Sequence, residues 1–271
     1  IAEKSKTYLS DVAVHDAADL DVVIDDAAVA LVARTGMPSL IKEASEGERI
    51  VLPVFNGREL TSVVSLKIGS PSEVTGVTEI WEPVGPYDEV RLTAGSFGKL
   101  ERFQNVSSFV RFEKGNGLPG QVWQDRRALI QNELANHPGF LRAAGASAGS
   151  LQSAIGIPVF ADRFLATVVL IGSQNSPIAG ACEVWDRVEG HFELCSAFYG
   201  SGNDLHRFDV GQTMPIDSGL LGLAVRQASA VTTFDAPTFL DGRSDWTGFA
   251  QGLAIPVFEN QEVTSVTILL F

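Results

Sequence analysis

The chain of 271 residues is 45% hydrophobic and 20% charged, which is ordinary for a folded protein and argues against disorder. Its net charge of −13 and the lack of any Lys/Arg cluster disfavour nucleic-acid partners. Cys182 and Cys195 are its only cysteines, which excludes a disulfide framework, and no apolar run reaches the ~20 residues that span a bilayer. We therefore expect a soluble, cytoplasmic protein without membrane partners.

The first predicted elements lie after an acidic N-terminal segment in which residues 6–14 show only a weak strand pattern. Residues 27–41 (AAVALVARTGMPSLI) predict a short helix, because small and apolar residues are followed by a Thr-Gly pair and a proline. Two strands follow at 51–55 and 61–68, and the Asn56-Gly57 pair between them is a strong two-residue turn signal. The segment therefore predicts a helix followed by a β-hairpin.

This hairpin occurs three times in the chain. Each copy contains the sequence Pro-Val-Phe, and the copies lie at 49–68, 154–171 and 252–270. The spacing between copies is about 100 residues, which is one small domain and too long for the usual solenoid repeats of roughly 20–50 residues. The chain therefore consists of repeated units.

A second hairpin also repeats, and it carries a tryptophan at the same strand position in each copy. Trp81 lies in the first of these hairpins and Trp185 in the second. The strands of the two hairpins are 76–84 with 89–97, and 183–188 with 191–198. Their short connections predict antiparallel sheets.

The segments between the hairpins hold the helical part of each unit. In the middle copy we expect a short helix opened by Gly117-Leu118-Pro119-Gly120, a strand at 127–131 and a helix at 137–148. The third copy repeats this order at 219–225, 230–234 and 239–249. The first copy has Ala27 and Ala30 where the later copies have glycine.

The sequences GLPGQVW (117–123), HPGFLRAA (137–144) and SAIGIPVF (153–160) together resemble the GAF domain, a small-molecule sensing module. The resemblance covers about 76–172, recurs at 180–271 and is partial at 27–69. It implies an α+β fold in which each unit has a central antiparallel sheet with short helices on one face. It also implies a ligand pocket between the sheet and its connecting loops; the family's ligands include cyclic nucleotides, tetrapyrroles, haem and amino-acid derivatives, and many members only dimerise.

Two domain partitions are open. The first has a partial, degenerate GAF-like unit at 1–75 and full units at 76–174 and 175–271. The alternative is permuted, with units at 1–97, 98–200 and 201–271, because the short links at 70–75 and 174–180 suit hairpins between neighbouring strands. These links also leave no room for the long signalling helices of many GAF proteins, and a homodimer or another protein partner could supply missing strands.

The candidate ligand-binding residues are aromatic, with one arginine beside them. In each case a packing role competes with ligand binding. An aromatic ring near an arginine favours an anionic planar ligand. The candidates are Trp81, Trp123, Phe140, Arg142, Trp185, Phe239 and Trp246. The four histidines are too scattered for a metal site, so no metal is expected, and the cofactor stays unknown.

The leading hypothesis is a sensory or regulatory protein that binds a small molecule in one or both later units, with no catalytic residues and no enzymatic activity. A structural scaffold or dimerisation module without ligand is the alternative. A minor alternative is a thiol reductase of the kind known on the GAF fold, which would use Cys182 and Cys195, with His191 four residues before the second cysteine.

Overall fold

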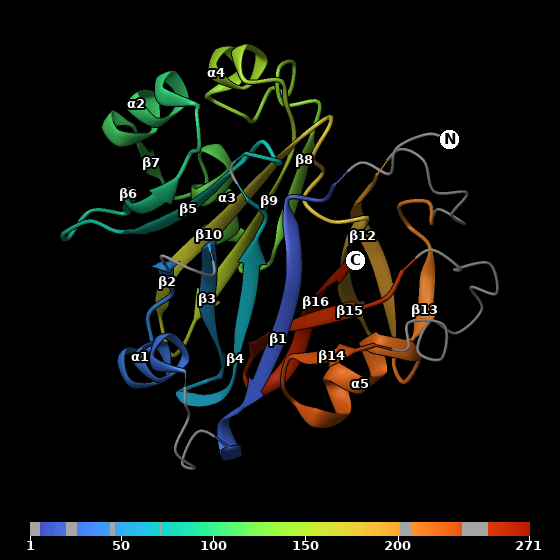
Figure 1. The fold of residues 1–271 in the computed structure, drawn as a ribbon. Helices are drawn as coiled ribbons and strands as arrows, with labels where there is room; N and C mark the ends of the chain where they lie inside the picture. The colour runs from blue at the N-terminus through green and yellow to red at the C-terminus, as the bar shows by residue number, and fades with distance from the viewer. Residues whose placement is uncertain (1–5, 20–25, 44–46, 71, 201–207, 235–248) are drawn as a thin grey trace.

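The protein is built from three curled antiparallel sheets with few helices (Figure 1). The structure, a computed structural model, describes residues 6–19, 26–43, 47–70, 72–200, 208–234 and 249–271. Strand dominates over helix in these residues, so the fold is richer in sheet than the expected α+β class. None of the helices in these residues is long and apolar enough to cross a membrane.

The first sheet has the strand order β1-β4-β3-β2. Its elements are β1 (Leu9–Asp16), η1 (Ala17–Asp19), α1 (Ala27–Thr35), β2 (Ser39–Glu43), β3 (Gly47–Asn56) and β4 (Glu59–Ile68). The carboxylate of Asp26 begins α1 by accepting hydrogen bonds from the backbone N–H groups of Ala28 and Val29, at 3.0 and 3.1 Å. Gly36 ends the helix in the left-handed conformation, with φ of 67°.

The second sheet has six strands in the order β7-β6-β5-β10-β9-β8. Its elements are β5 (Gly76–Pro83), β6 (Glu89–Ser96), α2 (Glu101–Phe109), β7 (Arg111–Glu113), α3 (Gly117–Asp125), β8 (Leu129–Asn132), α4 (Ala143–Ala148), β9 (Leu151–Phe160) and β10 (Phe164–Ser173). The helix expected at 137–148 is therefore shorter. Its first part is a turn, in which the Gly139 N–H donates to the ring Nδ1 of His137.

The third sheet repeats this order as β13-β12-β11-β16-β15-β14. Its elements are β11 (Ala181–Val188), β12 (His191–Tyr199), β13 (Thr213–Pro215), α5 (Gly219–Gln227), β14 (Val231–Thr233), β15 (Gly252–Glu259) and β16 (Glu262–Leu270). We call each sheet with its helices a unit, and number the units in chain order.

The strand register shows which elements correspond between units. Thr167 of β10 lies opposite Trp81 of β5, and Val266 of β16 lies opposite Trp185 of β11. In unit 1 the corresponding residue, Val63 of β4, lies opposite His15 of β1. The weak N-terminal strand therefore takes the place that the tryptophan-bearing strand has in the later units. Among the described residues, unit 1 has no counterparts of β6 and β7.

The three units close into a ring. One edge strand of each sheet packs against the following unit: β2 packs against β6, β8 against β11 and β12, and β14 against β1. We name these contacts junction 1–2, junction 2–3 and junction 3–1. Hydrogen bonds cross each of them, for example from Asn132 Nδ2 to the Ala197 carbonyl at 3.0 Å and from Gln251 Nε2 to the Val12 carbonyl at 2.7 Å. This head-to-tail arrangement places the edge strands β2, β8 and β14 against a neighbouring unit of the same chain.

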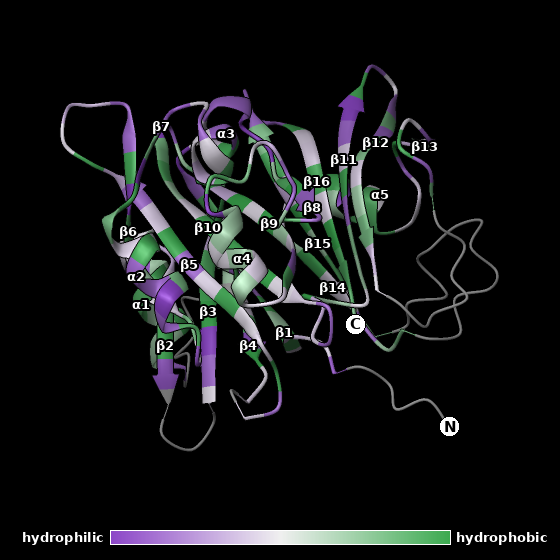
Figure 2. Cartoon of the chain, turned by 90° about the horizontal axis from the view of Figure 1, so that it is seen from above, coloured by the Kyte–Doolittle hydropathy of each residue, from purple (hydrophilic) through white to green (hydrophobic). Residues whose placement is uncertain are grey.

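One hydrophobic core is shared by all three units. Side chains from each sheet meet in it, including Leu52, Ile157, Val168, Ile255 and Ile268, and hydrophobic residues dominate β15 and β16 (Figure 2). The second sheet also has a core of its own on its other face, under α2, α3 and α4. The resemblance to GAF domains places a ligand pocket on this helix-covered face of the second sheet.

Candidate functional site

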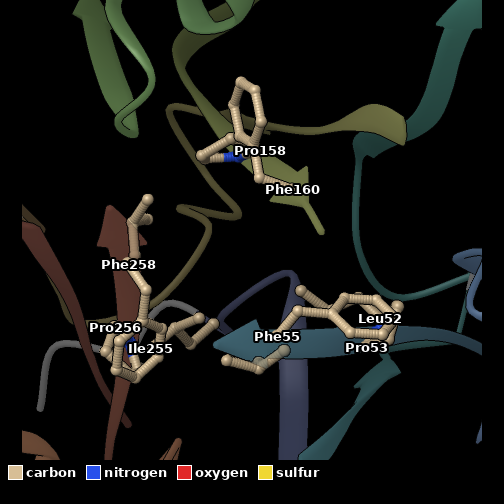
Figure 3. Close-up of a pocket in the computed structure, with 10 residues that line it drawn as sticks. Leu52, Pro53, Phe55, Pro158, Phe160, Ile255, Pro256 and Phe258 are labelled. Carbon is tan, nitrogen blue, oxygen red and sulfur yellow. The ribbon is translucent and has the colours of Figure 1, made fainter. Parts of the chain in front are cut away.

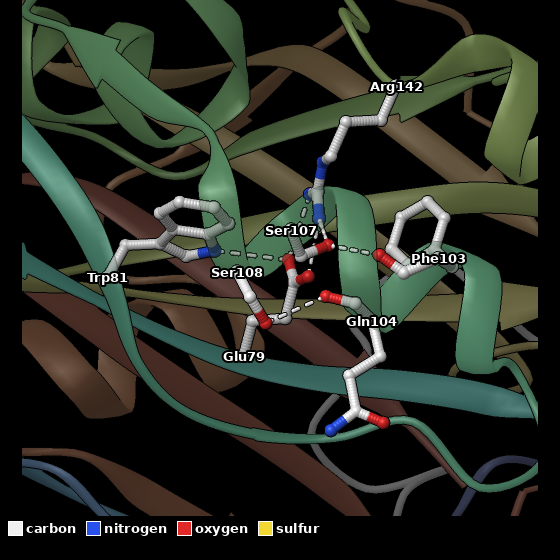
Figure 4. Close-up of polar contacts among 7 residues, drawn as sticks. All are labelled: Glu79, Trp81, Phe103, Gln104, Ser107, Ser108 and Arg142. Carbon is white, nitrogen blue, oxygen red and sulfur yellow. Dashed lines mark hydrogen bonds and ion pairs between the residues drawn. The ribbon is translucent and has the colours of Figure 1, made fainter.

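A buried ion pair lies at the centre of the helix-covered face of unit 2. The Arg142 guanidinium binds both carboxylate oxygens of Glu79, with Nη2 2.8 Å from Oε2 and Nη1 hydrogen-bonded to Oε1 (Figure 4). Nη1 also donates to the Ser107 hydroxyl at 2.6 Å, and Trp81 Nε1 donates to Glu79 Oε2 at 3.0 Å. The two charged side chains are 2% and 0% exposed, so water does not reach the pair.

Aromatic rings enclose the guanidinium on several sides. The Arg142 Cζ atom lies 4.6 Å from the ring centre of Phe103 and 5.2 Å from that of Trp81. The rings of Phe140 and Phe112 lie 5.3 and 5.8 Å away. Rings at these distances attract a cation through their negative faces. The cluster is therefore a cationic group held by one carboxylate and four aromatic side chains of the same unit.

Three elements position the cluster. Alternation along β5 turns Glu79 and Trp81 to the helix-covered face. Phe103 and Ser107 lie one turn apart on α2, so both reach the cluster from the same side of that helix. Arg142 enters from the turn just before α4. Because a buried ion pair repays its desolvation only with good geometry, this arrangement fixes how α2 and α4 dock on the sheet.

Unit 3 repeats part of this arrangement. Trp185 Nε1 donates to Glu183 Oε2 at 2.9 Å, and the Tyr199 hydroxyl donates to Glu183 Oε1 at 2.7 Å. The backbone N–H of Phe208 donates to the Tyr199 hydroxyl oxygen at 3.2 Å. The predicted site residues Phe239 and Trp246 lie outside the described residues.

Unit 1 has lost the polar pair. By strand register, Ala13 stands at the position of Glu79 and Glu183, and His15 at the position of the two tryptophans. A small apolar cluster including Val29, Val32 and Val63 fills this face instead. The buried carboxylate is therefore a feature of units 2 and 3 alone among the described strands.

The structure brings three of the predicted residues together and separates a fourth. Trp81, Phe140 and Arg142 share the cluster, whereas Trp123 stacks on Phe164 with ring centres 4.7 Å apart. Trp185 of unit 3 corresponds to Trp81 and donates to Glu183 as Trp81 does to Glu79. The side chains of the cluster fill the space between the sheet and the helices of unit 2. A ligand there would therefore have to displace Phe140 or Arg142. Ligand binding by these residues stays a prediction.

Sequence reasoning missed the carboxylate of the cluster. Glu79 and Glu183 each stand two residues before a repeated tryptophan, as EIW and EVW, so both side chains fall on one face of a strand. That repeated Glu-x-Trp pattern was the available signal. Ser107 carried none, because a serine within a nine-residue helix has no pattern that distinguishes it.

The three Pro-Val-Phe hairpins meet at one small cavity. Residues from all three units line it, including Pro53, Pro158, Phe160, Pro256 and Phe258 (Figure 3). Its volume of about 10 Å³ suffices for about one water molecule. The repeated motif therefore forms the centre of the ring and has no room for an organic ligand.

Larger cavities lie at two of the junctions. One of about 360 Å³ opens at junction 1–2, between Lys42 and Glu48 of unit 1 and the segment from Gly95 to Lys99 of unit 2. One of about 350 Å³ opens at junction 3–1, between Val14 of β1 and the β14 and α5 side of unit 3. Junction 2–3 contains the Arg127–Asp186 ion pair, at 2.6 Å.

The two cysteines are poor nucleophiles. Burial raises the pKa of the Cys182 thiol far above its ordinary value. Burial and the neighbouring Asp186 carboxylate raise the pKa of Cys195 to about 11. Both thiols are therefore protonated at neutral pH, whereas attack on sulfur requires a thiolate. The described residues contain no cluster of metal-ligating side chains.

Structure comparison finds GAF domains. The GAF domain of nlh2 from A. aeolicus is 19% identical, and the match covers 38% of this chain and 59% of that one, with a TM-score of 0.30. The GAF domain of a phosphoenolpyruvate-protein phosphotransferase from Coxiella burnetii is 22% identical, covering 34% and 56%, with a TM-score of 0.28. The predicted resemblance to GAF domains is thus confirmed, and three sheets fit tandem GAF-like folds.

A third similar structure is an enzyme. The free methionine-R-sulfoxide reductase from Neisseria meningitidis is 17% identical, covering 38% of this chain and 53% of that one, with a TM-score of 0.29. All three matches span less than two thirds of the other chain. No protein-family model and no curated protein matches the sequence.

The expectation that this chain is not an enzyme is wrong as a deduction from its GAF-like sequence. Methionine-R-sulfoxide reductases from two organisms, N. meningitidis and Thermoplasma acidophilum, are among the structures that resemble it. A GAF-like fold therefore does not exclude catalysis.

Proposed function

We propose that this chain is a regulatory binding module of three GAF-like units, and that small molecules bind between the units. One observation carries the proposal. The interior of unit 2 is filled by the Arg142–Glu79 pair and its rings, whereas cavities of about 360 and 350 Å³ lie at two junctions. Volumes of this size are typical of small-molecule sites. A cytoplasmic location agrees with this role and stays a prediction.

The domain partition that supports this proposal places units at 1–75, 76–174 and 175–271. Among the strands that the structure describes, β5 to β10 pair only with one another, as do β11 to β16, so each set forms its own sheet. The permuted partition would divide both sheets between two domains. Limited proteolysis tests the boundaries, because cleavage is expected in the links near 71 and 175 before any cleavage near 98.

Ligand screening by thermal shift tests the proposal. A ligand present at one hundred times its dissociation constant is expected to stabilise the chain by about 2.7 kcal/mol. Gln104→Trp fills the cavity at junction 1–2 and Gln227→Trp that at junction 3–1, since both residues line these cavities. Asn105→Trp is the matched control, because Asn105 is also exposed on α2 but lines neither cavity.

The result that supports the proposal is a thermal shift that one of the two cavity-filling variants abolishes and the control keeps. A shift that survives both variants, or no shift with nucleotides, amino acids, tetrapyrroles and organic acids, contradicts it.

A second candidate function is a structural or interaction scaffold, and the closed ring favours it. Three units that share one core present a rigid surface, as an assembly module requires. A homodimer or another protein partner belongs to this candidate. Sedimentation that shows a monomer at all concentrations would count against the homodimer.

A further inference from the structure

The cavity at junction 1–2 has walls from two units. Strands β2 and β3 of unit 1 contribute one wall, and the other wall comes from unit 2, from the end of β6 to the first turn of α2. Its lining includes Lys42, Glu48, Ser96, Gly98, Lys99 and Gln104. A ligand in this cavity would therefore touch both units at once.

The one carboxylate in the lining is already satisfied. Glu48 Oε1 lies 3.2 Å from the Lys42 ammonium, and the Ser96 hydroxyl donates to Glu48 Oε2. The Glu48 side chain is only 16% exposed, whereas that of Lys42 is 64% exposed. The Glu48 carboxylate is thus mostly buried in the cavity wall, and the ammonium group of Lys42 is the member of this ion pair that is accessible to a ligand.

The opposite wall carries a second cation. Lys99 is exposed in the turn just before α2 and lines the cavity. Within the described part of the chain, no carboxylate forms an ion pair with it. The accessible charge of the cavity is therefore positive, in a protein whose net charge is −13.

The polar and apolar parts of the lining suit a small organic acid. The Gln104 amide is exposed and can donate to an oxygen atom. Nothing lies within 4 Å of the position that a Cβ atom would take at Gly98, so a ligand can approach the backbone closely there. A cavity of about 360 Å³ holds a small molecule but no folded partner. Local positive charge raises the concentration of anions at such a site, most strongly at low salt.

We infer that the cavity at junction 1–2 binds a small molecule bearing a carboxylate or phosphate group, held between Lys42 of unit 1 and Lys99 of unit 2. The inference rests on the proposed function, which it sharpens by naming the site and the chemical class of ligand. Binding pulls the two walls together and so stabilises the contact between units 1 and 2.

Calorimetric titration of the full chain at low ionic strength tests this inference. Inorganic phosphate and succinate are the two probes, since they separate phosphate from carboxylate recognition. Lys99→Gln removes a charge that forms no ion pair among the described residues, so its fold is expected to be unchanged. Lys42→Gln removes the second charge, and Lys67→Gln, at an exposed lysine on β4 outside the cavity, is the matched control.

We expect saturable binding of at least one probe, weakened tenfold or more by Lys99→Gln and by Lys42→Gln, unchanged by Lys67→Gln and weakened by added salt. Binding that is equal in all four proteins overturns the inference, as does the failure of both anions to bind. If uncharged or cationic molecules bind at a junction instead, the proposed function stands and only this inference falls. If nothing binds at either junction, both are contradicted.

Discussion

Arg142 and Glu79 show how much depends on single residues in this fold. Each would be costly to bury alone, and each is buried only because the other is present. The aromatic rings around them exclude water, which strengthens the pair and raises the penalty for breaking it.

Glu79→Gln is therefore expected to destabilise the protein by about 3–5 kcal/mol, because it leaves the Arg142 charge buried without a partner. The double variant Glu79→Gln/Arg142→Met is expected to recover part of this loss. Urea unfolding measures both. Arg58→Gln is the control, since the Arg58–Asp162 pair is 84% and 47% exposed and such pairs contribute below about 1 kcal/mol. Equal losses for Glu79→Gln and Arg58→Gln would show that the buried pair has no special role.

Asp26 gives the chain a defined acid sensitivity. Burial raises the pKa of its carboxyl. The hydrogen bonds from Arg49 and from the backbone N–H groups of Val29 and Ala28 lower it by more than burial raises it, so the pKa of Asp26 lies below the ordinary value. A lowered folded pKa means that the stabilisation is present above about pH 4 and is lost as the pH falls through the folded pKa.

Asp26→Asn keeps an oxygen acceptor for the first turn of α1 but removes the charge. We expect it to flatten the fall in stability below about pH 4, whereas Asp26→Ala also loses about 1 kcal/mol at neutral pH through the lost cap. Denaturant unfolding at a series of pH values measures this. If Asp26→Asn loses stability below about pH 4 as steeply as the unaltered protein does, the acid sensitivity does not come from Asp26.

At the scale of elements, the helix that follows each tryptophan-bearing region packs unusually close to the segment before it. A Cβ atom at Gly120 of α3 would lie 2.1 Å from the Glu113 carbonyl oxygen, and one at Gly222 of α5 would lie 2.1 Å from that of Asp217. Unit 1 has Ala30 at this position of α1, in agreement with its shorter connection.

Gly120→Ala and Gly222→Ala are each expected to cost about 1–3 kcal/mol, because backbone must move to admit the methyl group. Gly190→Ala is the matched control, since nothing lies within 4 Å of its added carbon. Thermal unfolding compares the three. If Gly190→Ala is as harmful as the two helix variants, the close approach is not the cause.

The sequence predicted those elements whose pattern is local. The Pro-Val-Phe hairpins, the glycine-opened helices and the tryptophan hairpins all appear where their turn residues and alternation placed them. Strand β1 was barely predicted, because its pairing partner β4 lies about fifty residues away and only the completed sheet defines its role. The sequence marks Arg142, close to Phe140, as a candidate for ligand binding, but it does not predict the ion pair with Glu79, because that acid lies 63 residues earlier in the chain.

At the scale of the whole molecule, the shared core ties the three units together. Ile157 of unit 2, Leu52 of unit 1 and Ile255 of unit 3 belong to the same cluster, so opening one sheet exposes apolar surface of the others. Units that merely followed one another along a chain would lack this coupling.

Unfolding is therefore expected to be cooperative across all three units. Ile157→Ala should destabilise the protein by about 2–5 kcal/mol and raise amide exchange in β3 and β15 as well as in β9. Hydrogen exchange followed by mass spectrometry resolves these strands. Val106→Ala, on the exposed face of α2, is the control. Faster exchange confined to unit 2 would show that the units open independently.

The ring of units also explains how one site can differ from the next. A trimer of identical subunits must repeat every contact three times, so a cleft at one interface is a cleft at all of them. Here a single chain encodes each interface separately: an ion pair between Arg127 and Asp186 joins one, while Lys42 and Lys99 line the cavity of another. Because the three interfaces are encoded by different residues, symmetry does not constrain them, and a substitution at one leaves the residues of the other two unchanged.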